Sequence, residues 1–168
     1  FRSSKDGELA AQRVYYVANT NYSLSESSFI LTRLAHDDDR FSGYDSQSDI
    51  SVNYGRNLLA NTPNMAVTLN VGLGMRRSRS EEENFDEPML RLATDYEWNI
   101  SPNAIFVQHI STESGDETSI FRSESSIETQ ILDNLALKFS INVKHQTEVP
   151  VGREKTDTET AITFVLDF

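Results

Sequence analysis

Apolar and polar residues alternate along several stretches of this chain. The clearest stretch is "NMAVTLNVGLGMR" (64–76), in which every second position is apolar: Met65, Val67, Leu69, Val71, Leu73 and Met75. The intervening positions carry small or polar residues, from Ala66 to Arg76. A period of two residues predicts a β-strand with one apolar face, and a 3.6-residue helical period fits it badly.

The same alternation recurs along the rest of the chain. It is clear in 50–56, 89–100, 121–131, 135–146 and the closing 161–168, and weaker in 13–22, 28–36 and 104–112. We therefore predict nine strands. Many of them exceed the length of about 5–6 residues that is usual in globular proteins, and they approach the roughly 9–11 residues of a tilted transmembrane strand.

The connections between these strands alternate in character. Short turns are expected at 23–27, 60–64, 101–103 and 133–134, and longer or more charged loops at 37–47, 78–88, 113–117 and 148–157. This alternation is typical of an outer-membrane meander with short periplasmic turns and long external loops. An aromatic girdle is expected near the turns, where the sequence places Tyr22, Tyr96, Trp98 and Phe106.

The predicted fold class is an all-β, antiparallel up-and-down transmembrane β-barrel, in a single domain over residues 1–168. The apolar positions predict a lipid-facing set: Val67, Leu69, Val71, Leu73, Leu137, Phe139, Ile141, Phe164 and Leu166. The polar positions predict a lumen-facing set: Arg76, Arg91, Asp95, Glu97, Arg122, Glu124, Glu128, Lys138 and Lys144. Mixed charge of this kind forms a salt-bridged plug in a narrow barrel or lines a pore in a wider one.

A soluble β-sandwich or lipocalin-like barrel is the alternative, because such proteins also alternate, with the apolar face inward. Long strands favour the membrane barrel over this alternative. So do polar faces that carry both signs of charge together with glycine and asparagine.

The composition argues against several other classes of protein and of site. The net charge of −11 disfavours nonspecific binding to nucleic acid, whose phosphates would be repelled. The chain has no cysteine, which removes a disulfide framework, a thiolate zinc site and a cysteine nucleophile. No apolar run approaches the roughly 18–20 residues of a membrane helix. The chain begins with Phe1 and shows no signal peptide, so we expect a mature or trimmed N-terminus.

Candidate chemistry is sparse. His109 and Ser111 lie two apart on one strand, and this pair resembles the catalytic pair of outer-membrane lipid A deacylases. The rest of that pattern is missing, because no Asn follows Ser111 and no Arg precedes the pair on the strand. Serine hydrolysis also needs an oxyanion hole. We expect two polar lumen residues, no catalytic residue and no enzyme.

The acidic stretches 36–40 and 80–87 are rich in carboxylates, which Ca²⁺ prefers as ligands. Neither stretch has the spacing and glycine of an EF-hand loop. We expect solvated acidic loops, and no metal or cofactor.

Three stretches resemble the YdiY-like, salt-stress-induced outer-membrane protein family (domain of unknown function 481). They are "DDRFSGYDSQSDISVNYGRNLL" (38–59), "LRLATDYEWNIS" (90–101) and "LALKFSINVKHQTEVPVGREKTDTETAITFVLDF" (135–168). The loop "VPVGREKTDT" followed by a terminal aromatic strand is the most specific part. Members of the family carry further N-terminal strands, whereas this chain opens on what resembles a loop, 1–13. The resemblance therefore implies a barrel of about twelve strands.

The ending on Phe168 resembles the terminal aromatic strand that the barrel assembly machinery reads. The resemblance implies a location in the bacterial outer membrane and gives no reaction. Expected partners are outer-membrane lipid, lipopolysaccharide, the assembly machinery and possible envelope proteins, with no nucleic acid.

Three classes of function remain. They are a structural, stress-related or passive-pore (porin-like) barrel, a barrel subunit that docks an envelope partner through acidic loops, and a barrel enzyme that acts on lipid A. The missing catalytic constellation favours the first.

Overall fold

The computed structural model describes residues 2–5, 8–39, 44–59, 62–80, 84–132 and 134–166, which form strands and their connections. None of these described segments forms a helix that is long and apolar enough to cross a membrane. The strands are β1 (Arg2–Lys5), β2 (Glu8–Ser23), β3 (Ser28–Asp39), β4 (Ser46–Asn57), β5 (Met65–Arg79), β6 (Asn84–Ser101), β7 (Ala104–Gly115), β8 (Ser119–Leu132), β9 (Leu135–Gln146) and β10 (Thr156–Leu166).

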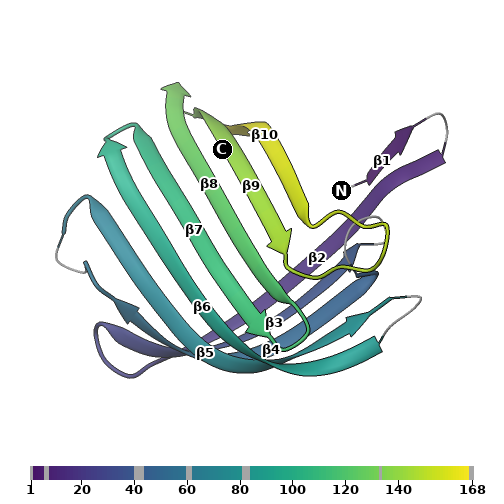
Figure 1. Ribbon diagram of the computed structural model, residues 1–168. Coiled ribbons are helices and arrows are strands. Elements are labelled where there is room, and N and C mark those ends of the chain that lie inside the picture. Colours follow the sequence, from purple (N-terminus) through teal and green to yellow (C-terminus); the bar gives the residue numbers. More distant parts are fainter. Residues whose placement is uncertain are drawn as a thin grey trace.

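Every strand pairs antiparallel with its neighbour in the sequence, so the order in the sheet is β1 to β10 (Figure 1). The predicted all-β, up-and-down meander is therefore confirmed. Within the described residues, β10 pairs only with β9, and β1 pairs only with β2. The described part of the chain is thus an open, curved sheet, and the expected closure into a barrel is not seen in it.

The strands extend further into the charged segments than the alternation of apolar residues predicts. β3 reaches Asp39, β6 begins at Asn84 and β7 reaches Gly115, so much of the expected loops 37–47, 78–88 and 113–117 is strand. Opposite charges face each other in this region, as in the register pair Arg76↔Glu87. Cross-strand ion pairs stabilise a sheet where apolar residues are missing. The prediction of loops at these positions was wrong for that reason.

The start of the chain also differs from the expectation. Residues 1–13 were expected to form a loop, but β1 pairs with β2, which already begins at Glu8. The sheet therefore has ten described strands instead of nine. Phe168, the expected terminal assembly signal, lies outside the described residues, because β10 ends at Leu166.

The sheet curves strongly, so that β2–β4 lie opposite β7–β9 (Figure 1). Side chains from strands far apart in the sheet meet on the concave side, which we call the inner face. Arg33 of β3 contacts Glu113 of β7, and Lys144 of β9 contacts Asp37 of β3. Side chains at the alternate positions point to the opposite, outer face.

The distribution of side chains is inverted relative to a soluble protein. Among the described residues, sixteen buried residues are polar or charged and six are apolar. Large apolar side chains are exposed instead, including seven of the nine expected to face lipid: Leu69, Val71, Leu73, Phe139, Ile141, Phe164 and Leu166. The other two, Val67 and Leu137, lie half-buried on the same face. Soluble β-sandwiches and lipocalin-like barrels carry their apolar side chains on the inner face, whereas the buried side chains of this sheet are mostly polar or charged.

Candidate functional site on the inner face

A cluster of charged side chains lies on the inner face, in the strand halves that lead to the longer connections. We call it the buried charge cluster. Its members are Arg33, Arg76, Arg91, Arg122, Lys144, Asp37, Asp49, Glu87 and Glu113. None of these side chains is more than 10% exposed. Buried charges persist only when they are paired and hydrogen-bonded.

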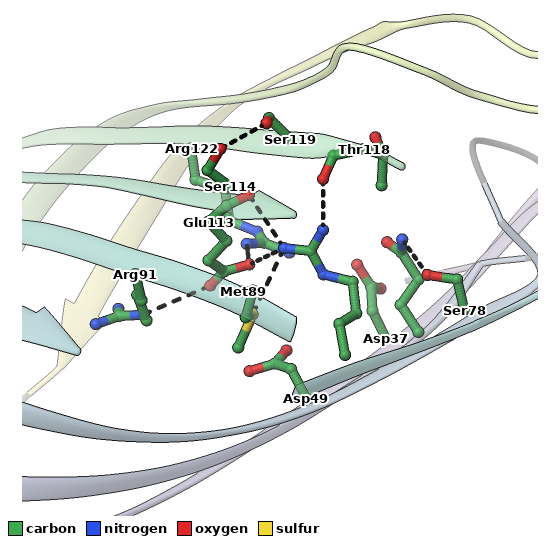
Figure 2. A network of polar contacts seen from close by, with 12 residues as sticks. Asp37, Asp49, Ser78, Met89, Arg91, Glu113, Ser114, Thr118, Ser119 and Arg122 are labelled. Carbon is green, nitrogen blue, oxygen red and sulfur yellow. Dashed lines mark hydrogen bonds and ion pairs between the residues drawn. The ribbon is translucent and has the colours of Figure 1, made fainter. Parts of the chain in front are cut away.

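Glu113 is the centre of this cluster (Figure 2). Its Oε2 lies 2.6 Å from Arg122 Nη1 and 3.4 Å from Arg76 Nη2. Its Oε1 lies 3.5 Å from Arg91 Nε and 3.6 Å from Arg33 Nη1. One carboxylate of β7 is thus shared by guanidinium groups from β3, β5, β6 and β8.

Arg33 and Lys144 make three further contacts in this cluster. Arg33 pairs with Asp49 through Nη1, and its Nη2 donates a 2.8 Å hydrogen bond to the Tyr15 hydroxyl. Lys144 Nζ lies 3.0 Å from Asp37 Oδ2 and so joins β9 to β3. The Arg33 contacts join β3 to its paired neighbours β2 and β4. The Lys144–Asp37 pair links strands that do not pair directly, so it helps to set the curvature.

Arg76 fixes the connection between β7 and β8. Its Nη1 donates to the Thr118 carbonyl at 3.0 Å and to Glu87 Oε1 at 3.2 Å. The backbone N–H of Glu117 donates to Glu87 Oε2 at 2.8 Å. A Cβ added at Gly115 would lie 2.1 Å from Glu87 Oε2, so only glycine allows this close approach.

A pocket of about 340 Å³ adjoins the cluster on the side of the short turns. Its lining includes Tyr15, Arg33, Asn70, Arg91, Ser111 and Arg122. Asp95, His109 and Glu124 also line it, further toward the turns. The pocket is therefore bounded by arginines at one end and by acidic groups at the other.

His109 and Ser111 both lie on the inner face and line this pocket. His109 Nδ1 is 2.6 Å from Asp95 Oδ1, which is an arrangement that orients a histidine. Ser111 is buried and faces Arg122 in the register of β7 and β8. Within the described residues, no hydrogen bond joins Ser111 to His109. Among these described residues, His109 therefore has an orienting carboxylate but no hydrogen bond to Ser111.

The residues predicted to face the lumen divide into two groups. Arg76, Arg91, Arg122 and Lys144 belong to the buried charge cluster. The rest lie on the same face nearer the turns, exposed or half-buried: Asp95, Glu97, Glu124, Glu128 and Lys138.

Sequence reasoning missed four acidic members of the cluster: Asp37, Asp49, Glu87 and Glu113. Three of them fell in segments expected to be loops. A signal was available for Glu113, because it follows Ser111 by two residues and shares its face if the strand continues.

The acidic stretches 36–40 and 80–87 belong largely to strands in the described part of the chain. His36–Asp39 belongs to β3 and Asn84–Glu87 to β6, which corrects the expectation of solvated loops there. Residues 40 and 81–83 lie outside the described residues. No group of three or more metal-ligating side chains comes together among the residues that the structure describes.

The expected aromatic residues lie at the turn end of the strands. Tyr96 and Phe106 contact each other edge-on, with ring centroids 6.2 Å apart. Trp98 and Phe106 are opposite each other in the register, beside the 101–103 turn, and Tyr22 is exposed near the end of β2. Their side chains point to the outer face, where the apolar residues of the neighbouring strands also lie.

Comparisons with known proteins give one family. The family model described as "Protein of unknown function, DUF481" matches residues 1–168. The "Uncharacterized protein YdiY" of Escherichia coli (strain K12) is 24% identical over 162 residues, which cover 95% of this chain and 64% of that protein. The chain thus spans less than two thirds of the relative's length. No solved structure matches the chain.

Replacing Glu113 with glutamine should lower the free energy of unfolding by about 3–5 kcal/mol, because removing one partner leaves buried charges uncompensated. The urea midpoint of protein refolded in detergent measures this loss. Asp86→Asn is the control, because Asp86 bonds Arg77 at an exposed site on the outer face. The control should leave the midpoint unchanged. A Glu113→Gln midpoint equal to that of the parent would contradict the central role of Glu113.

Proposed function

The chain belongs to the DUF481 family, and on that premise we propose that it is an integral β-barrel protein of the bacterial outer membrane with a structural, stress-related or passive-pore role. The observation that carries the proposal is the inverted distribution of side chains, with charge buried on the inner face and apolar residues exposed on the outer face. A bilayer is the solvent in which such an outer face is stable.

The dimensions of the outer face support this proposal. On β5, the outward apolar residues run from Met65 to Met75. Ten residue steps at about 3.4 Å span about 34 Å along the strand, and a tilt of about 35–45° reduces this to a height of about 24–28 Å. A transmembrane barrel carries an apolar band about 25 Å tall. The charged pair Arg77–Asp86 follows directly beyond this run.

The proposal requires that the free edges of the sheet find partners. The bilayer core has no water to satisfy unpaired N–H and C=O groups, so a spanning sheet must be closed. We propose that further strands pair with the edges formed by β1 and β10, giving about twelve in all as the family resemblance implies. Outer-membrane lipid and lipopolysaccharide are the proposed partners of the outer face, and the barrel assembly machinery is the proposed partner during insertion.

The inner face supports a passive role in this proposal. The buried charge cluster holds the inner wall of the barrel in shape, and its arginines and acids face the lumen. In the part of the chain that the structure describes, no hydrogen bond joins a serine to the Asp95–His109 pair. We propose on this basis that the protein is not a hydrolase. A lumen of this kind contributes structure and a polar passage, with no chemical step.

Val71→Arg should lower the free energy of unfolding in a bilayer by about 2–4 kcal/mol, because Val71 lies at the middle of the apolar run. Val71 is 48% exposed in the sheet, and Val151 is 95% exposed in the connection before β10. Val151→Arg is therefore the matched control and should have no effect. If the outer face lies in water instead, both substitutions should be tolerated, so equal stability of the two variants refolded in lipid vesicles would count against membrane insertion.

Ser111→Ala should leave the acylation of lipid A unchanged when the parent and the variant are expressed in the same cells. Mass spectrometry of extracted lipid A makes the comparison. A difference in acyl chain number between parent and variant would revive the deacylase interpretation of His109 and Ser111.

A further inference from the structure

The buried charge cluster contains more cations than carboxylates. Its cations are Arg33, Arg76, Arg91, Arg122 and Lys144, and its carboxylates are Asp37, Asp49, Glu87 and Glu113. Lys144 and Asp37 pair with each other, so they are set aside. The remaining four arginines face three carboxylates, which leaves one excess positive charge among these described groups, in a chain whose net charge is −11. An uncompensated buried charge is costly, so the excess indicates that an anion belongs at this place.

Arg91 is the least compensated of these cations. Its Nε lies 3.5 Å from Glu113 Oε1, while three other guanidinium groups compete for the same carboxylate. Its Nε and Nη1 are buried and make no hydrogen bond with the described residues. Figure 2 shows the outer end of the Arg91 guanidinium directed away from the Glu113 carboxylate. Arg122 Nε is likewise buried without a hydrogen bond.

The pocket beside the cluster leaves room for a ligand that accepts hydrogen bonds from these guanidinium groups. Arg33, Arg91 and Arg122 all line its 340 Å³ volume, at the low end of the usual size of small-molecule sites. The planar guanidinium fork matches the geometry of carboxylate and phosphate oxygens. Neutral polar groups of Asn70 and Ser111 line the same space. Of the acidic groups nearer the turns, Asp95 is held by His109 at 2.6 Å and by Asn70 at 3.4 Å.

We propose that this pocket binds a small oxyanion, a phosphate or a carboxylate, with Arg91 and Arg122 as its principal ligands. The bound oxyanion supplies the negative charge that the cluster lacks, and it accepts hydrogen bonds from the unsatisfied guanidinium N–H groups. This binding function goes beyond a passive barrel. It depends only on the inner face, so it stands or falls independently of the membrane location.

The test compares the urea midpoint of the full chain, refolded in detergent, in sodium phosphate, sodium acetate and sodium chloride at one pH and one ionic strength. A ligand that binds only the folded state stabilises it in proportion to the logarithm of its concentration above the dissociation constant. We expect phosphate or acetate to raise the midpoint of the parent above its value in chloride. The salt that raises the midpoint identifies the oxyanion as a phosphate or a carboxylate.

Arg91→Gln is the decisive variant. It removes an under-compensated buried cation, so in chloride it should be at least as stable as the parent, and it should lose the dependence on phosphate or acetate. Arg77→Gln, on the outer face, is the matched control and should keep that dependence. Isothermal titration of the folded parent and of Arg91→Gln with the active anion should show binding only for the parent.

Three outcomes would overturn the proposal. The first is that chloride gives the same midpoint as both oxyanions at equal ionic strength, which would mean general screening of charge. The second is that the dependence on phosphate or acetate survives in Arg91→Gln. The third is that Arg91→Gln is strongly destabilised in chloride and binds the anion as the parent does, which would make Arg91 a structural member of the ion-pair network.

Discussion

The carboxylate of Glu113 is the contact on which the shape of this sheet depends. It draws guanidinium groups from β3, β5, β6 and β8 toward a single point on the inner face. Backbone hydrogen bonds join only neighbouring strands, so they do not by themselves bring β3 opposite β7. The Lys144–Asp37 pair adds a second tie across the concavity, between β9 and β3. A sheet without an apolar inner face is thus held in its curve by shared charge.

The outer face follows from the same alternation. Each strand has a period of two residues, so placing Arg76 and Arg91 on the inner face places Met75 and Leu92 on the outer one. Large apolar patches rarely remain open to water on a soluble monomer. The buried charges and the exposed apolar band are therefore two consequences of one pattern. The proposed bilayer outside and polar lumen inside would satisfy both.

Much of the fold followed from sequence because alternation is a local property. Each of the nine predicted segments overlaps an observed strand, and the last of them, 161–168, is described as strand as far as Leu166. The errors came where charge replaced apolar residues, as in 78–88 and 113–117, because cross-strand ion pairs depend on a register that no single strand reveals. The alternation of side chains along each strand was enough to place four cations on the inner face: Arg76, Arg91, Arg122 and Lys144. Their shared partner Glu113 was missed because its segment was expected to be a loop.

The most direct test of membrane insertion uses the absence of cysteine, which allows single-cysteine spin labels along β5 between residues 67 and 74. The labelled variants are reconstituted in lipid bilayers, and the accessibility of each label to oxygen and to a water-soluble relaxation agent is measured. The account predicts high accessibility to oxygen and low accessibility to the water-soluble agent at Val67, Leu69, Val71 and Leu73. At the intervening positions it predicts low accessibility to oxygen, with the water-soluble agent reaching the label or with neither agent reaching it. Outward labels that report water, with no alternation along β5, would contradict it.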